Sequence, residues 1–153
     1  MAVQVRRLTP DDWPQLWPLL VGMGVNAEPP EAQRDRGTRL LDDPRWGVLG
    51  AAMADGLAGY AAVQDHGPHL RAGDDHRVAR LHDLYVRPEH RRSGVGRALM
   101  AAVTYWAAAQ GVRHLEWQAH CERAAPFYER LGYHGDPCPQ PDYPTFLLDL
   151  RKQ

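Results

Sequence analysis

The chain has 153 residues, of which 18 are Lys or Arg and 19 are Asp or Glu, a size typical of one domain with one core. Its 44% apolar and 24% charged residues exclude a disordered chain, and the near-zero net charge argues against a nucleic-acid partner. Because no apolar run approaches the roughly 18 residues that span a bilayer, and the first residues lack the apolar stretch of a secretory signal, we expect a cytoplasmic protein with no membrane partner.

The first half of the chain predicts a strand, two helices and a hairpin. Thr9 followed by Pro10 is a typical helix start, and apolar residues follow at helical spacing. The pair Asp55-Gly56 between two apolar runs predicts a β-hairpin. In chain order we expect a strand over 3–8, helices over 10–21 and 31–41, and strands over 46–53 and 57–64.

The second half predicts three strands and two helices. Its clearest element is a long helix with one apolar stripe, closed by Gly111. The expected elements are an exposed loop over 65–76, a strand over 78–86, a helix over 94–110, a strand over 114–119, a helix over 122–131 and a strand over 143–150. With one further short strand near Tyr133, the order β-α-α-β-β-β-α-β-α-β predicts a single α/β (α+β) domain over residues 1–153.

A turn between the strand over 78–86 and the long helix carries two glycines. Free N–H groups at a helix start and the helix dipole favour a bound anion. Gly94 and Gly96 have no side chain to block close approach of the backbone to that anion. The turn has no Lys and no third glycine, so it is neither a Walker loop nor a dinucleotide fingerprint. It predicts a phosphate-binding site, with a flexible turn and solvated arginines as the alternative.

Two motifs together resemble the GNAT N-acetyltransferase superfamily. Arg91-x-x-Gly94-x-Gly96, preceded by Leu84-Tyr85-Val86-x-Pro88, is similar to the cofactor motif of that family. Residues 124–133, which read AAPFYERLGY, are similar to its downstream segment. The resemblance implies a mixed sheet of six to seven strands flanked by about four helices, and an acyltransferase that uses acetyl-CoA.

The resemblance also implies where acetyl-CoA binds. The backbone N–H groups of the turn would hold the pyrophosphate, and the strand end at residues 84–86 would pair with the pantetheine arm. The strand that begins near His114 would splay away to leave room for it. The residues expected to bind the cofactor are Leu84, Val86, Arg91, Arg92, Ser93, Gly94, Val95, Gly96 and Arg97.

The expected reaction is attack by a neutral amine on the thioester carbonyl. Tyr128 corresponds to the tyrosine that, in this family, gives a proton to the leaving thiolate. The alternative is that Tyr128 only packs in the core beside Phe127. The family often has Asn seven residues earlier, where this chain has Cys121.

The base that removes the proton from the amine has several candidates. Asp83 and Glu116 are the predicted catalytic carboxylates, and His82 and His120 also remain open. His82 and Asp83 are neighbours on one strand. Because successive side chains of a strand point to opposite faces, only one of them is expected to face the acceptor unless a β-bulge intervenes.

The acceptor pocket is expected near the first two helices, where aromatic and acidic residues suit a cationic amine. Trp17, Glu28 and His82 are the predicted substrate-binding residues, with packing of Trp13 and Trp17 in the core as the alternative. The resemblance implies a small-molecule primary amine, such as a polyamine, an aminoglycoside or an amino acid. The arrangement around residues 52–56 is loosely similar to aminoglycoside 6′-acetyltransferases. A protein or peptide N-acetyltransferase and a non-catalytic CoA-binding module are the alternatives.

Two further expectations concern metals and assembly. The two cysteines and eight histidines show no metal-ligand spacing, so no metal is expected. A homodimer is possible, with Trp46, Trp117 and the last strand serving either an interface or the core.

Overall fold

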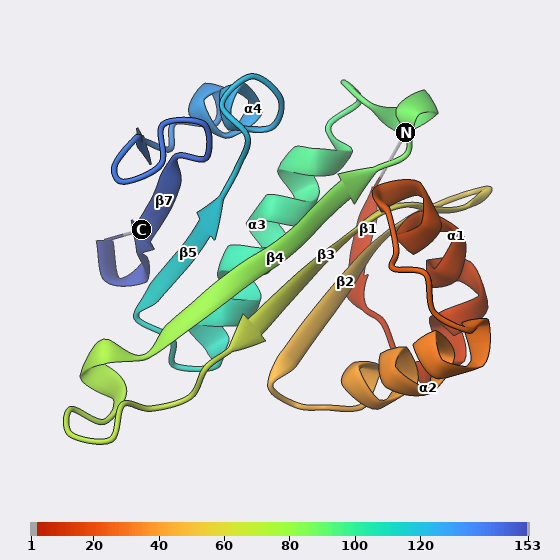
Figure 1. Cartoon of the computed structure of the whole chain (residues 1–153), viewed down its shortest axis with the longest axis horizontal. Coiled ribbons are helices and arrows are strands. Elements are labelled where there is room, and N and C mark those ends of the chain that lie inside the picture. Colours follow the sequence, from red (N-terminus) through yellow and green to blue (C-terminus); the bar gives the residue numbers. More distant parts are fainter. Residues whose placement is uncertain (1–2, 153) are drawn as a thin grey trace.

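A computed structural model describes residues 3–152 and contains one seven-stranded sheet with the order β1-β2-β3-β4-β5-β7-β6 (Figure 1). All neighbouring strands are antiparallel except β4 and β5, which are parallel. The strands are β1 (Gln4–Arg7), β2 (Trp46–Met53), β3 (Gly56–Asp65), β4 (Val78–Val86), β5 (His114–Gln118), β6 (Gly135–Asp136) and β7 (Thr145–Asp149), and the helices are α1 (Trp13–Met23), α2 (Pro30–Leu41), α3 (Val95–Ala109) and α4 (Ala125–Arg130). The predicted element order and mixed sheet are confirmed.

The two most regular local signals produce the expected structures. The β2–β3 hairpin turns at Gly56, which has a φ of +116°. Helix α3 buries Val95, Leu99, Val103 and Ala107 at four-residue spacing. This stripe lies against the sheet, so α3 is held by apolar packing along its whole length.

Helices cover the two faces of the sheet differently. Helix α3 packs on one face, where its buried residues join a large apolar cluster with β3, β4, β5 and β7. Helices α1 and α2 pack on the opposite face, in a second cluster centred on Trp13, Leu16 and Tyr60. Figure 1 shows both helices beside β1–β3, with β5 and β7 farther away. On this face the end of α1 reaches β4, where Gly22 lies against the Tyr85 ring.

Several element boundaries differ from the expectations. A 3-10 turn over Pro10–Asp12 precedes α1, because the Asp12 carboxylate accepts a hydrogen bond from the Thr9 N–H at 2.8 Å. Helix α1 continues to Met23, with Gly22 inside it. The short strand near Tyr133 is β6, and β7 begins at Thr145.

The predicted loop over 65–76 starts one residue too early, so its first residue was assigned wrongly. Asp65 is the last residue of β3 and is buried, with its carboxylate bonded to the Arg77 guanidinium at 2.5 Å and to the Gly67 N–H at 2.8 Å. A buried carboxylate requires such partners, so Asp65 fixes the loop that leads into β4. Within residues 3–152, no helix is long and apolar enough to cross a membrane.

Candidate active site

Strands β4 and β5 part in the middle of the sheet. Their pairing runs only from Val78–His114 to Arg80–Glu116, although β4 continues to Val86. The predicted splaying of these two strands is confirmed. Beyond Arg80, one edge of β4 lies along an opening that β5 does not fill.

Backbone groups of β4 face this opening. The Arg87 N–H donates to the Ala58 carbonyl of β3 at 2.8 Å. Because the direction of backbone groups alternates along a strand, the N–H and C=O of Leu84 and Val86 point away from β3. The Val86 carbonyl accepts a hydrogen bond from Arg91 Nε at 2.9 Å, and the Arg91 guanidinium lies 5.8 Å from the Tyr85 ring centroid.

The turn before α3 presents unpaired N–H groups. The first backbone N–H bonded within α3 is that of Ala98, which donates to the Gly94 carbonyl at 3.0 Å. Among the described residues, the N–H groups of 92–97 have no backbone acceptor. Gly94 has a φ of +88°, and a Cβ built on it would meet no atom within 4 Å. Open space, free donors and the exposed side chains of Arg92 and Arg97 fit a diphosphate.

Gly96 has a second reason to lack a side chain. A Cβ built on it would lie 2.9 Å from Cζ of Phe127 in α4. The sequence interpretation considered only the approach of a phosphate. The structure shows that this glycine also lets α4 pack on the first turn of α3.

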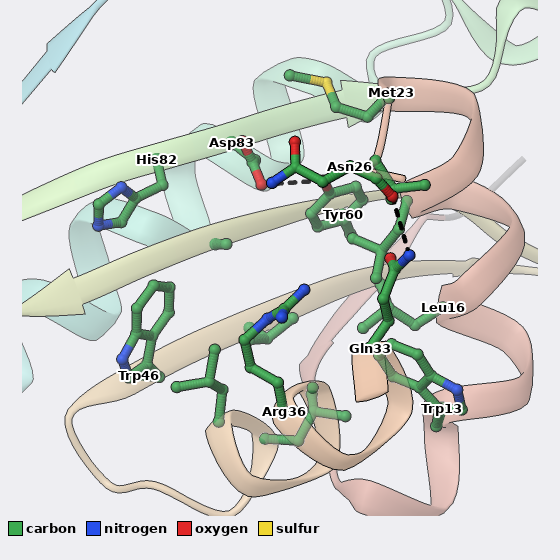
Figure 2. A pocket seen from close by; sticks show the side chains of 18 residues that line it. Trp13, Leu16, Met23, Asn26, Gln33, Arg36, Trp46, Tyr60, His82 and Asp83 are labelled. Carbon is green, nitrogen blue, oxygen red and sulfur yellow. Dashed lines mark hydrogen bonds between the residues drawn. The ribbon is translucent and has the colours of Figure 1, made fainter. Parts of the chain in front are cut away.

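A cavity of about 420 Å³ lies on the face that carries α1 and α2 (Figure 2). Both His82 and Asp83 line it, because β4 has a bulge opposite the Ala62–Val63 step of β3. Leu81 and Leu84 both pack in the cluster on the α3 face, so the two residues between them face the other side. The bulge thus brings together two side chains that a regular strand would separate.

Among the described residues, the Asp83 carboxylate has one hydrogen-bond partner. The Tyr60 hydroxyl donates to Asp83 Oδ2 at 3.1 Å, and Tyr60 is 1% exposed. Burial first, and the charge of Asp83 second, raise the pKa of Tyr60 far above its usual range. Tyr60 therefore stays protonated and orients the carboxylate toward the cavity.

Tyr128 lies on the α3 face of the sheet, in the middle of α4. Its ring is 5% exposed and packs 5.2 Å from Trp117, 5.1 Å from Phe127 and 5.4 Å from Phe146, measured between ring centroids. Burial raises the pKa of Tyr128 well above its usual range, and the negative charge of Asp83 adds to this. The phenol stays protonated at neutral pH and is close enough to Asp83 to interact with it electrostatically.

The other candidate bases lie elsewhere or have other partners. Glu116 pairs with Arg80 at 3.7 Å and does not line the cavity. His120 Nδ1 accepts a hydrogen bond from the Glu122 N–H at 3.2 Å. Within residues 3–152, no group of three or more His, Cys, Asp or Glu is placed to hold a metal ion.

His82 is held between Gln64 and Trp46 at the cavity wall. Its Nε2 lies 2.9 Å from Gln64 Oε1, and its ring stacks on Trp46 with centroids 5.1 Å apart. Burial, and then the charge of Arg80, lower the pKa of His82. His82 is therefore neutral at pH 7 and adds no positive charge to the cavity.

The other two predicted substrate-binding residues do not line the main cavity. Trp17 stacks on Trp13 with centroids 5.6 Å apart and lines a separate hollow of about 240 Å³. Glu28 accepts two hydrogen bonds from the Arg36 guanidinium, at 2.8 and 3.1 Å. Arg36 itself lines the main cavity.

Sequence reasoning missed several cavity residues. These are Gln33, Arg36, Trp46 and Tyr60. The sequence does not distinguish Gln33 from the other polar residues of the second helix, but the structure buries it among mostly exposed side chains. Its Nε2 donates to the carbonyls of Asn26 and Glu28 at 3.1 Å each, which fixes the loop between α1 and α2.

Comparison with known proteins agrees with this geometry. Residues 4–133 match the family model described as "Acetyltransferase (GNAT) family". The chain belongs to this GNAT acetyltransferase family. It is 33% identical over 122 residues to an aminoglycoside N(6′)-acetyltransferase type 1 of Stenotrophomonas maltophilia, covering 79% of this chain and 78% of the relative. It is 29% identical over 142 residues to a D-amino-acid N-acetyltransferase of Saccharomyces cerevisiae, covering 88% and 86%.

Solved structures of acetyltransferases share the fold. One is the PaiA N-acetyltransferase of Thermoplasma acidophilum in complex with coenzyme A, with a TM-score of 0.70, 15% identity, and 97% and 99% of the two chains covered. Another is an aminoglycoside acetyltransferase from an uncultured soil metagenomic sample, with a TM-score of 0.70, 24% identity, and 86% and 91% covered. The family match and the similarity to named N-acetyltransferases identify this GNAT protein as an acyltransferase.

Proposed function

We propose that this acyltransferase transfers the acetyl group of acetyl-CoA to the primary amine of a small molecule. The observation that carries the proposal is the opening between β4 and β5. The turn before α3 lies at one end of it, and Asp83 and Tyr128 lie on opposite faces of the sheet beside it. Relatives named as N-acetyltransferases of aminoglycosides and of D-amino acids support a nitrogen acceptor on a small molecule.

The proposed cofactor site consists of backbone and arginine groups. Acetyl-CoA, when bound, supplies an acetyl group activated as a thioester. The unpaired N–H groups of 92–97 would hold its pyrophosphate, with Arg92 and Arg97 adding charge. The N–H and C=O of Leu84 and the N–H of Val86 would hydrogen-bond the pantetheine amides along the edge of β4.

The proposed catalytic groups are Asp83 and Tyr128. Asp83 holds the acceptor ammonium at the opening and takes its proton, directly or through water. The apolar walls of the cavity favour the neutral amine, which is the form that attacks. Tyr128, protonated at neutral pH, offers a hydrogen bond to the leaving sulfur.

The test combines binding and turnover. We expect isothermal titration to show binding of acetyl-CoA, and a thiol-detection assay to show CoA release in the presence of small primary amines. Absence of acetyl-CoA and CoA binding at millimolar concentration would refute the proposal. Binding without CoA release across amines and peptides would identify a non-catalytic module, and acetylation of peptides alone would identify a peptide acetyltransferase.

A further inference from the structure

The walls of the main cavity are largely apolar. Side chains of α1, α2, β2 and β3 form them, among them Trp13, Leu20, Leu40, Trp46 and Val48. Figure 2 shows Trp46 at one end, and Leu16 and Trp13 at the other. Binding of an apolar group against such a surface is favourable, because both surfaces are removed from water. Binding of hydrated hydroxyl groups there is not, because they lose their hydrogen bonds to water.

The apolar surface of the cavity extends to its rim. Met23, at the end of α1, is 45% exposed, and Val25, in the loop that follows, is 42% exposed. Both line the cavity. Exposed apolar side chains gathered at the mouth of an apolar cavity extend the surface that a bound apolar body would cover.

The charges of the cavity suit a single ammonium group. Among residues 3–152, Asp83 is its one lining carboxylate, and Arg36 is its one lining residue with a permanent positive charge. The Arg36 side chain points into the cavity from α2, on the side away from β4 (Figure 2). Arg36 is already paired with the Glu28 carboxylate, which does not line the cavity. Among the described lining residues, a second ammonium on the same acceptor would therefore find this paired guanidinium and no second carboxylate.

We infer that the acceptor is a primary amine with one positive charge on an apolar or aromatic body, the ammonium at Asp83 and the body against the walls of α1, α2 and Trp46. This inference rests on the proposed function and narrows the class of amines that can serve as the acceptor. It excludes polyamines and aminoglycosides as preferred acceptors, because both carry several ammonium groups. It also disfavours α-amino acids, because an α-carboxylate would lie next to the Asp83 carboxylate.

The first experiment measures CoA release with the wild-type chain and acetyl-CoA. The acceptors are 2-phenylethylamine, phenylalanine, spermidine and kanamycin, together with the linear amines from propylamine to hexylamine. We expect kcat/KM for 2-phenylethylamine to exceed that for each of the other three by at least tenfold. Along the linear series we expect KM to fall by about fourfold for each added methylene until the cavity is filled.

Two matched variants test the role of charge. Arg36→Gln removes the guanidinium, and we expect it to raise kcat/KM for spermidine relative to 2-phenylethylamine by at least fivefold. Glu28→Gln breaks the same ion pair but leaves the guanidinium in the cavity. We expect Glu28→Gln to lower the relative activity on spermidine, since loss of the ion pair alone cannot explain a gain.

The outcomes separate this inference from the proposed function. Preference for spermidine, kanamycin or phenylalanine, or a KM independent of chain length, overturns the inference while leaving an acetyltransferase. Acetyl-CoA binding without acetylation of any apolar monoamine also overturns it. Failure to bind acetyl-CoA overturns the proposed function itself.

Discussion

Gly94 provides the sharpest test of the phosphate site that we propose in the turn before α3. It is the residue before the first turn of α3, and its φ of +88° lies in the left-handed region. Replacing it with Ala adds one methyl group in open space, since no heavy atom of the described residues, apart from its chain neighbours, lies within 4 Å of that position. The methyl group meets no other side chain of the protein, so its effect on ligand binding can be separated from an effect on packing.

Two magnitudes follow from this geometry. The left-handed conformation costs an Ala about 1–2 kcal/mol, which we expect to appear as a loss of folding stability without ligand. The methyl group also blocks the approach of a phosphate to the N–H groups behind it. Losing one hydrogen bond to a charged group costs about 1.5–3 kcal/mol, so the Kd of acetyl-CoA should rise by about 10- to 150-fold.

The control is a glycine at the other end of the same helix. Gly111 follows α3 with a φ of +85°, and a Cβ there would have ordinary contact with Arg77 at 3.7 Å. Gly111→Ala should lower the unfolding temperature as Gly94→Ala does, but leave acetyl-CoA affinity within about twofold in isothermal titration. Equal affinity of the folded Gly94→Ala and wild-type chains would refute the assignment of this turn to phosphate.

Three further outcomes are expected. Tyr128→Phe should lower kcat by about 10²–10⁴-fold in the CoA-release assay with little change in acetyl-CoA affinity, and an unchanged kcat would remove Tyr128 from the reaction. Asp83→Asn should lower kcat/KM for amines by a similar factor in the same assay, whereas Glu116→Gln should change it by less than threefold. The hydrogen bonds from Arg6 lower the pKa of Asp12 to about 2 from an ordinary 3.8, so this carboxylate stabilises the fold fully above pH 4 and loses that contribution as the pH falls through about 2. In urea unfolding, Asp12→Asn should therefore be less stable than wild type by about 1–2 kcal/mol at pH 7, a value reduced because the Arg6 side chain is partly exposed to water. At pH 2 the variant should have nearly wild-type stability. Asp11→Asn, at an exposed position, is the control.

The fold was largely predictable because its strongest signals are local. The Asp55-Gly56 turn specifies a hairpin within a few residues, and the apolar stripe of α3 specifies its buried face. The ends of helices and strands were harder to predict where side-chain hydrogen bonds determine them. Asp12 starts α1 through its bond to Thr9, and Asp65 is buried through its bond to Arg77, and neither contact follows from periodicity.

The site was predictable only in part, because its key feature is a break in periodicity. Strict alternation would place His82 and Asp83 on opposite faces, and no residue type in β4 marks the bulge that puts both on one face. Trp46 was expected in the core or at an interface, yet it lines the cavity and stacks on His82. Trp117, by contrast, is in the core, at 1% exposed.

Arg91 holds the turn before α3 in one conformation before any ligand binds. Its side chain connects the start of the turn to the end of β4, through the Val86 carbonyl and the Tyr85 ring, and the Ser93 hydroxyl bonds to the His90 carbonyl. A glycine-containing segment without such contacts would lose roughly 1–2 kcal/mol of conformational entropy per residue on closing around an anion. Here the turn is ordered when the protein folds, so ligand binding does not carry that entropic cost. A larger part of the free energy of each hydrogen bond to a phosphate therefore contributes to affinity.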